Sequence, residues 1–390
     1  MKRWIGAVGV VAAANGSAAG QSAEPWSGWE TETDGDVVLT LAPGWGDETG
    51  GPEPETMLYE IGAGFRAERV LDNGAEIGAR LVVRAQRDHP DRAAGTGAIA
   101  SDLATAPGAF TGVATGADRS EAGPRARLEA AYIYIDGGYG EVTLGRDVGV
   151  ASRFQEGPES VFSHVRVADA LLDPSGLTLA RARLDTTGSS AKVSYATPRL
   201  LGLRAGASYT PSTEADGLDR SAARAIGTDL EDTVELAANL SRPLGRGGPR
   251  LRAAAAYTTS DVANGSAVYA GSAEAWSLGL HVEGERLGFG VSHVSADDAR
   301  VFSARAGASD DRVRVWTAGF DGSAWTLDWS VMGSTTETEA GLDAKAWSVG
   351  VGRSFFDGLT LSAGFQGRTV DAGATSIDST GVVLEITQSW

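Results

Sequence analysis

The chain has 390 residues and a formal net charge of −18, with 42% hydrophobic and 22% charged residues. This surplus of acidic groups argues against a nucleic-acid-binding protein, which needs a basic face for the phosphates. The sequence contains no cysteine, which excludes disulfides, thiol catalysis and thiolate metal sites. No run of about eighteen apolar residues follows the first segment, so the mature chain is not predicted to cross a membrane with helices.

The N-terminus has the pattern of an export signal. Lys2 and Arg3 precede a short apolar run from Ile5 to Ala14, and small residues follow around positions 17–23. We therefore expect residues 1–23 to be a signal peptide and residues 24–390 to form one mature domain. A buried first helix is the weaker alternative, because the run is short and interrupted by glycine.

Apolar alternation with a period of two begins near residue 36 and recurs in pairs of segments, which predicts β-hairpins. In residues 57–70, for example, Ile61 and Phe65 share one face and Glu60 and Arg66 share the other. Asn73-Gly74 follows, a strong signal for a tight hairpin turn. Further segments pair in the same way: 125–136 with 139–147, 191–199 with 203–211, 232–244 with 250–260, 274–283 with 287–295, 311–320 with 324–333, and 344–356 with 359–370.

With single segments at residues 35–45 and 381–390, the pattern predicts about sixteen strands of about ten residues. Tight turns alternate with long polar connectors, which is typical of outer-membrane barrels and unlike a solenoid of fixed period. The predicted fold class is therefore all-β, a closed antiparallel transmembrane β-barrel. Besides the connector at 148–189, long connectors are expected at 87–123, 212–231, 261–273, 296–310, 334–343 and 371–380.

The final segment alternates as well, with Val382, Leu384, Ile386 and Trp390 on one face. A sheet that spans a bilayer must pair all of its backbone groups, so we expect this segment to pair with the first strand. Trp390 would then lie at a membrane interface, where amphipathic aromatic side chains are favoured. Other aromatic residues near strand ends are candidates for the same belts, namely Tyr59, Tyr209, Tyr257, Trp276, Trp325, Trp347 and Phe355.

Three stretches, 130–147, 192–211 and 381–390, resemble the general diffusion porins of Gram-negative outer membranes, particularly the alphaproteobacterial branch. The resemblance in hairpin order covers most of residues 36–390. It implies a homotrimer of sixteen-stranded barrels in the outer membrane, surrounded by lipid and lipopolysaccharide. It also implies that the third external loop folds into the lumen, that the barrel-assembly machinery recognises the last strand, and that small hydrophilic solutes pass through.

Counting strands places the third external loop at residues 148–189. The loop mixes apolar residues with carboxylates, which indicates packing against an inner wall. We expect an acidic side of the constriction on this loop and a basic side on the barrel wall, which together would set up a field across the channel. The acidic candidates are Glu156, Glu159 and Asp169, and the basic candidates are Arg66, Arg80, Arg84 and Arg146.

No catalytic or metal-binding motif is present in the sequence. The four histidines, at positions 89, 164, 281 and 293, lack metal-site spacing, and Ser292 and His293 would point to opposite faces of one strand. No enzyme activity and no cofactor are expected. Calcium at Asp297-Asp298 or Asp310-Asp311 is a minor hypothesis, because the EF-hand spacing is missing.

The predicted function is passive diffusion of small hydrophilic solutes and ions through an outer-membrane porin. Two alternatives remain open. One is a barrel with a blocked lumen and a structural or adhesive role. The other is a substrate-selective channel.

Overall fold

A computed structural model describes residues 28–47, 54–89, 123–213, 230–262, 272–297, 312–339, 342–356, 358–372 and 375–390. The predicted signal peptide lies outside these residues, as do Asp298, Asp310 and Asp311 of the calcium hypothesis. Among the described residues, no helix has the length and apolar character needed to cross a membrane.

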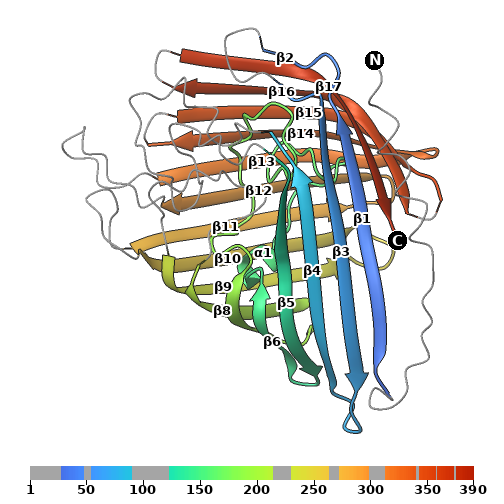
Figure 1. Cartoon of the computed structure of the whole chain (residues 1–390), viewed down its shortest axis with the longest axis vertical. Helices are drawn as coiled ribbons and strands as arrows, with labels where there is room; N and C mark the ends of the chain where they lie inside the picture. The colour runs from blue at the N-terminus through green and yellow to red at the C-terminus, as the bar shows by residue number, and fades with distance from the viewer. Residues whose placement is uncertain are drawn as a thin grey trace.

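The strands form one closed antiparallel sheet (Figure 1). Within the described ranges the sheet has seventeen strands, but β2 (Gly46–Asp47) has only two residues and pairs with Ser379 and Thr380 of the last strand. The remaining sixteen close the barrel, as predicted. They are β1 (Glu30–Leu41), β3 (Met57–Val70), β4 (Glu76–Arg87), β5 (Arg125–Gly137), β6 (Gly140–Asp147), β7 (Ser190–Ala196), β8 (Leu203–Ser212), β9 (Leu230–Pro243), β10 (Arg250–Val262), β11 (Ser272–Glu283), β12 (Leu287–Asp297), β13 (Arg312–Ala324), β14 (Leu327–Thr338), β15 (Leu342–Ser354), β16 (Leu359–Ala372) and β17 (Thr375–Ser389).

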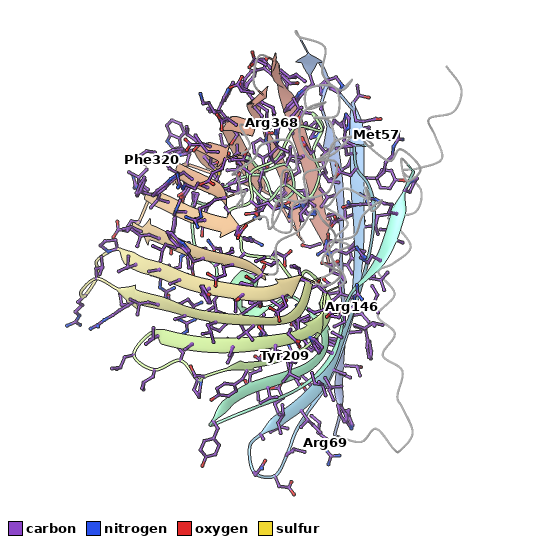
Figure 2. All side chains as sticks on the ribbon, turned by 90° about the vertical axis from the view of Figure 1, so that its left-hand side faces the viewer. Met57, Arg69, Arg146, Tyr209, Phe320 and Arg368 are labelled. Atoms are coloured by element: carbon purple, nitrogen blue, oxygen red, sulfur yellow. The ribbon has the colours of Figure 1, made fainter. Side chains whose placement is uncertain are left out.

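The two faces of the wall differ as the alternation predicts. On β3, Ile61 and Phe65 point outward and are 47% and 43% exposed, whereas Leu58 and Glu60 point inward and are buried. An outer face of this kind is covered by lipid in a membrane, while the lumen keeps the polar groups. Met57 and Arg69 mark the two ends of this strand, at opposite ends of the barrel (Figure 2).

The barrel closes between β1 and β17, as predicted. Their register pairs Asp36 with Ser389 and Leu41 with Leu384. Beyond the last pair, the Gly35 N–H donates to the Trp390 carbonyl at 3.2 Å and the Trp390 N–H donates back at 3.1 Å. The indole ring of Trp390 covers Gly35, and a Cβ on Gly35 would lie only 2.8 Å from the ring carbon Cε2. Glycine is therefore required at the position where the barrel closes.

Two of the predicted long connectors are wrong. Residues 334–343 and 371–380 lie largely in strands, because β14 continues to Thr338 and β17 begins at Thr375. Polar side chains do not interrupt these strands, since backbone pairing continues beyond the apolar band. The turn predicted at 321–323 is also shifted: β13 continues to Ala324, and Trp325 takes a positive φ of 57° and is 99% exposed at the turn.

Candidate channel constriction

The connector between β6 and β7 lies inside the barrel, in green in Figure 1. It begins with the single helix of the described residues, α1 (Val150–Arg153), which packs against β8, β9 and β10. The Val150 N–H donates to Ser208 Oγ at 2.8 Å, and Phe154 is buried against the wall. This connector, residues 148–189, is called the inner loop below.

From α1 the inner loop runs along the inward faces of β11 to β16. Ser277 Oγ donates to Gln155 Oε1 at 3.0 Å at the start of this path. Farther along, the Val161 N–H donates to Ser330 Oγ at 3.1 Å, and Ser362 Oγ donates to the Val161 carbonyl at 2.7 Å. Hydrogen bonds from several strands therefore fix the path of the loop.

Inward-facing glycines make this close path possible. A Cβ on Gly290 would lie 2.8 Å from the carbonyl carbon of Gly157, and one on Gly350 would lie 2.9 Å from Phe162 Cζ. Gly279, Gly319 and Gly364 face the loop or neighbouring side chains in the same way. We call these five glycines the glycine seat: Gly279, Gly290, Gly319, Gly350 and Gly364.

The returning half of the inner loop is also held by buried polar groups. Arg368 Nε of β16 donates to Thr178 Oγ1 at 2.7 Å, and the Thr178 N–H donates to Asp173 Oδ2 at 2.7 Å. Near β7, Thr187 Oγ1 donates to Glu235 Oε1 of β9 at 3.0 Å. The loop is therefore anchored at its root and along its return.

The predicted loop carboxylates separate into two environments. Glu156 and Glu159 both lie beside Arg252 of β10, with Arg252 Nε 3.7 Å from Glu156 Oε2 and Arg252 Nη2 bonded to Glu159 Oε1. Asp169 instead lies within the loop and accepts the N–H groups of Ala182 at 3.1 Å and Arg183 at 3.3 Å. Burial raises the pKa of the Asp169 carboxyl. Its hydrogen bonds stabilise the loop from within, so Asp169 does not line the channel as predicted.

Three of the predicted arginines point into the lumen, but their partners are carboxylates of the wall and not of the inner loop. Arg80 binds Asp34 with two hydrogen bonds of 2.5 and 2.7 Å. Arg66 pairs with Glu68 and Glu76, and Arg84 pairs with Asp36 and Glu60. The direct pairing of loop acids with this wall is therefore absent among the described contacts.

Arg146 does not belong to the lumen wall. It lies on the same face of β6 as the outward-pointing Val142 and Leu144, and opposite Ala131 of β5. Its Nε donates to the Leu128 carbonyl at 2.8 Å. A side chain at this register position points away from the channel. The prediction that Arg146 lines the pore wall is therefore wrong.

The wall that the inner loop leaves uncovered borders a hollow of about 370 Å³. Tyr132 and Tyr134 point into it, while Ile133 is exposed on the outer face. Arg153 of α1 reaches Glu141 of β6 at 2.6 Å on the far side. Charged side chains and two phenol rings therefore surround the opening: Glu32, Asp34, Arg66, Arg80, Tyr132, Tyr134, Glu141 and Arg153.

Arg252 and Arg153 were not among the sequence candidates. The sequence did contain a signal for Arg252. In the alternating segment 250–260 it lies on the same face as Ala254 and Ala256, which is the face that points into the lumen. Arg153 carried no such signal, since it precedes irregular chain in which side-chain direction follows no fixed period.

A family model described as Gram-negative porin matches residues 7–390. The chain belongs to this family. This porin is therefore an outer-membrane channel for passive diffusion. A search of curated proteins finds no match.

Solved porin structures share its fold at low sequence identity. The anion-selective porin from Comamonas acidovorans has a TM-score of 0.60 and 14% identity, covering 93% of this chain and 100% of that one. OmpF of Salmonella typhi in complex with daunomycin has a TM-score of 0.59 and 13% identity, covering 93% and 98%. The channel DcaP of Acinetobacter baumannii has a TM-score of 0.57 and 9% identity, again covering 93% and 98%.

Proposed function

We propose that this porin prefers cations, and that its solutes pass between the inner loop and the part of β1 and β3 to β6 that borders the first hollow. The supporting observation is the excess of carboxylates among the ion-paired groups of the lumen. In the part of the chain that the structure describes, seven lumen arginines share ten carboxylates, so these ion-paired groups together carry negative charge. A lumen of that sign concentrates cations and repels anions.

A second hollow strengthens this proposal. It has a volume of about 400 Å³ and lies beside the tight turn at 284–286. Its lining includes one arginine, Arg286, and five carboxylates. Cations that enter by this end therefore meet negative charge before the constriction. The carboxylates are Glu159, Glu283, Glu285, Asp321 and Asp328.

The test is the reversal potential of purified protein in a planar bilayer under a potassium chloride gradient. A potential of the sign that favours potassium supports the proposal. A potential that favours chloride would overturn it and would give this porin the anion selectivity that is named for the Comamonas porin. A folded, inserted protein without conductance would instead indicate a blocked lumen.

We also propose that the outward face of β1, β3, β4 and β5 contacts two further copies in a homotrimer. This face carries small residues such as Ala63, Ala67, Ala79 and Ala85, and these strands contain no tryptophan. By contrast, Trp276, Trp316 and Trp347 lie exposed on β11, β13 and β15, as expected for strands that face lipid. Insertion of conductance in threefold steps is the expected result.

The same proposal includes lipopolysaccharide around the lipid-facing strands and recognition of β17 by the barrel-assembly machinery. No cofactor is needed, because diffusion requires only a water-filled path.

Acidification should weaken the cation preference through Glu156. Burial, opposed by the Arg252 guanidinium, raises the pKa of the Glu156 carboxyl. A raised pKa means that Glu156 becomes neutral at a higher pH than an ordinary glutamate. As the pH falls, the contribution of Glu156 to the cation preference is therefore lost before that of glutamates with an ordinary pKa. We expect Glu156→Gln to lower the cation preference at neutral pH and to remove this early step in the reversal potential. An unchanged pH profile in Glu156→Gln would contradict the assignment.

A further inference from the structure

The tip of the inner loop, residues 163–165, is held by one carboxylate. Glu385 of β17 points into the lumen and is 2% exposed. Its Oε1 accepts the Ser163 N–H at 2.6 Å, and its Oε2 accepts the N–H groups of His164 at 2.9 Å and Val165 at 3.0 Å. Ser163 Oγ donates to Oε1 as a fourth bond, at 2.9 Å. A carboxylate with four donors forms strong, charge-assisted hydrogen bonds.

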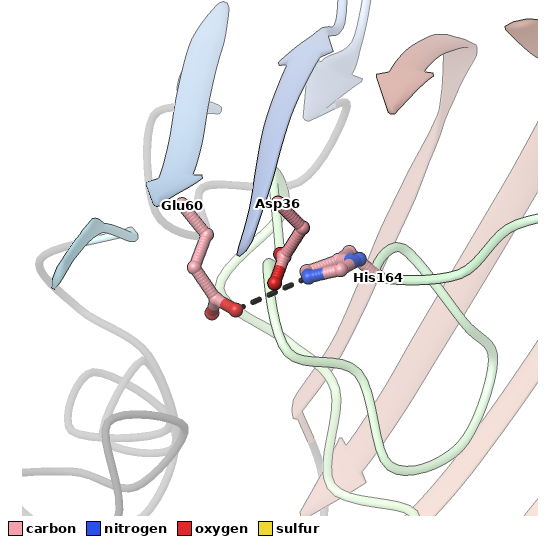
Figure 3. Close-up of side chains that lie close together, drawn as sticks. All are labelled: Asp36, Glu60 and His164. Atoms are coloured by element: carbon pink, nitrogen blue, oxygen red, sulfur yellow. Dashed lines mark hydrogen bonds and ion pairs between the residues drawn. The ribbon is translucent and has the colours of Figure 1, made fainter. Parts of the chain in front are cut away.

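His164 extends the same contact to the other side of the barrel seam. Figure 3 shows His164 beside Glu60 of β3 and Asp36 of β1. His164 Nε2 lies 3.2 Å from Glu60 Oε1, and His164 Nδ1 lies 2.7 Å from Ser163 Oγ. Arg84 of β4 forms ion pairs with both carboxylates, those of Asp36 and Glu60. The imidazole therefore lies between two carboxylate-bearing strands and the end of the loop.

Glu60 fixes the donor in its contact with His164. A carboxylate only accepts, so His164 Nε2–H donates to Glu60 Oε1. On the other side of the ring, Nδ1 faces Ser163 Oγ. The ring therefore links the tip of the loop to β3.

We propose that Glu385 and His164 are positioning residues that form a loop latch, together with Ser163 and Glu60. The latch fastens the tip of the inner loop to the seam where β17, β1 and β3 meet. It keeps the open channel at one width, and its release lets the tip move into the path and close the channel. Release of the latch changes how often the channel closes and leaves its preference between cations and anions unchanged.

The first test is Glu385→Gln in planar bilayers, with Glu274→Gln as the matched control. Glu274 lies exposed on the outward face of β11, so its substitution removes the same charge without touching the loop. In Glu385→Gln the amide NH₂ replaces an acceptor oxygen, and backbone donors lose their partner. We expect closures to occur about ten times more often, or more, because hydrogen bonds to charged groups are the stronger ones. The reversal potential should keep its sign.

A disulfide rescue separates loop release from damage to the barrel. Ser163 Oγ and Thr387 Oγ1 lie 3.4 Å apart, and the protein has no cysteine of its own. In the Glu385→Gln background, channels with Ser163→Cys and Thr387→Cys should stay open when the disulfide is formed and close often when it is reduced. Two results would overturn the proposal. One is frequent closing that persists after the disulfide has formed, and the other is a closing frequency in Glu385→Gln equal to that of the wild type.

His164→Gln tests the contact with Glu60 separately. Glutamine at this position cannot bridge Ser163 and Glu60 as the imidazole does. We expect channels of His164→Gln to close more often than the wild type, and oxidised Ser163→Cys with Thr387→Cys to suppress these closures. A closing frequency equal to that of the wild type would show that His164 is not part of the latch.

Discussion

Gly290→Val should push the inner loop away from the wall and into the lumen, and so give a smaller single-channel conductance. The valine Cβ would overlap Pro158 and approach the carbonyl carbon of Gly157 to 2.8 Å, and neither backbone group can move aside without moving the loop. Overpacking of this kind costs about 1–3 kcal/mol. The hydrogen bonds of Val161 to Ser330 and Ser362 contribute about 1 kcal/mol each, so the clash is large enough to unseat this part of the loop.

Gly333→Val is the matched control for this substitution. Gly333 lies on β14 with its side-chain position outward, and a Cβ there would meet only the Ala346 carbonyl, at 3.8 Å. Conductance and the rate of entry of larger sugars into protein-containing vesicles should fall for Gly290→Val and stay at the wild-type level for Gly333→Val. Equal conductance in both variants would mean that the loop does not limit the channel.

Arg84→Ala should both weaken the barrel and raise its cation preference. Glu60, one of the two partners of Arg84, has a side chain that is only 2% exposed, so removing the arginine leaves a buried carboxylate with less compensation. Breaking a buried ion pair costs about 3–5 kcal/mol. Because Arg84 is 29% exposed and Glu60 keeps His164 as a partner, we expect the lower end, about 3 kcal/mol.

Arg80→Ala provides the comparison, since its partner Asp34 is 42% exposed. An ion pair of this exposure contributes about 1 kcal/mol or less. Urea unfolding in detergent should therefore separate the two variants, while both shift the reversal potential toward potassium. Arg84→Lys keeps the charge and should restore the selectivity. Equal stability of Arg84→Ala and Arg80→Ala would contradict the buried character of the Glu60 pair.

The barrel could be predicted because each strand carries its own signal. Alternation over 57–70 and 76–87, with Asn73-Gly74 between them, defines β3 and β4 without knowledge of the remaining chain. The predictions failed where that signal is weak. Residues 334–343 and 371–380 are polar on both faces, so no alternation marks them as strand, although their backbones pair with their neighbours.

The position of the inner loop could be predicted, but its partners could not. Its apolar residues indicated packing, and Phe162 is indeed fully buried. Glu385 and Arg252 are far from the loop in sequence, and only the closed barrel brings them to it. The partners of Asp169 lie close to it in the sequence, but the sequence does not show them. A carboxylate in a loop is expected to face water, whereas Asp169 accepts hydrogen bonds from backbone N–H groups within the loop. The prediction for Arg146 was wrong although the alternation of β6 gives its direction, since it shares the face of the outward-pointing Val142 and Leu144.

The anchoring of the inner loop has a consequence for the order of folding. Ser163 and Glu385 are separated by 222 positions in the chain, and the glycine seat belongs to strands that are synthesised after the loop. Contacts between such distant segments form slowly, because the intervening chain must be ordered first. The narrowest part of the channel can therefore form only after β17 has joined the wall. Until then the growing barrel encloses a wider opening than the finished one, so a membrane that assembles this protein is leakiest just before assembly ends.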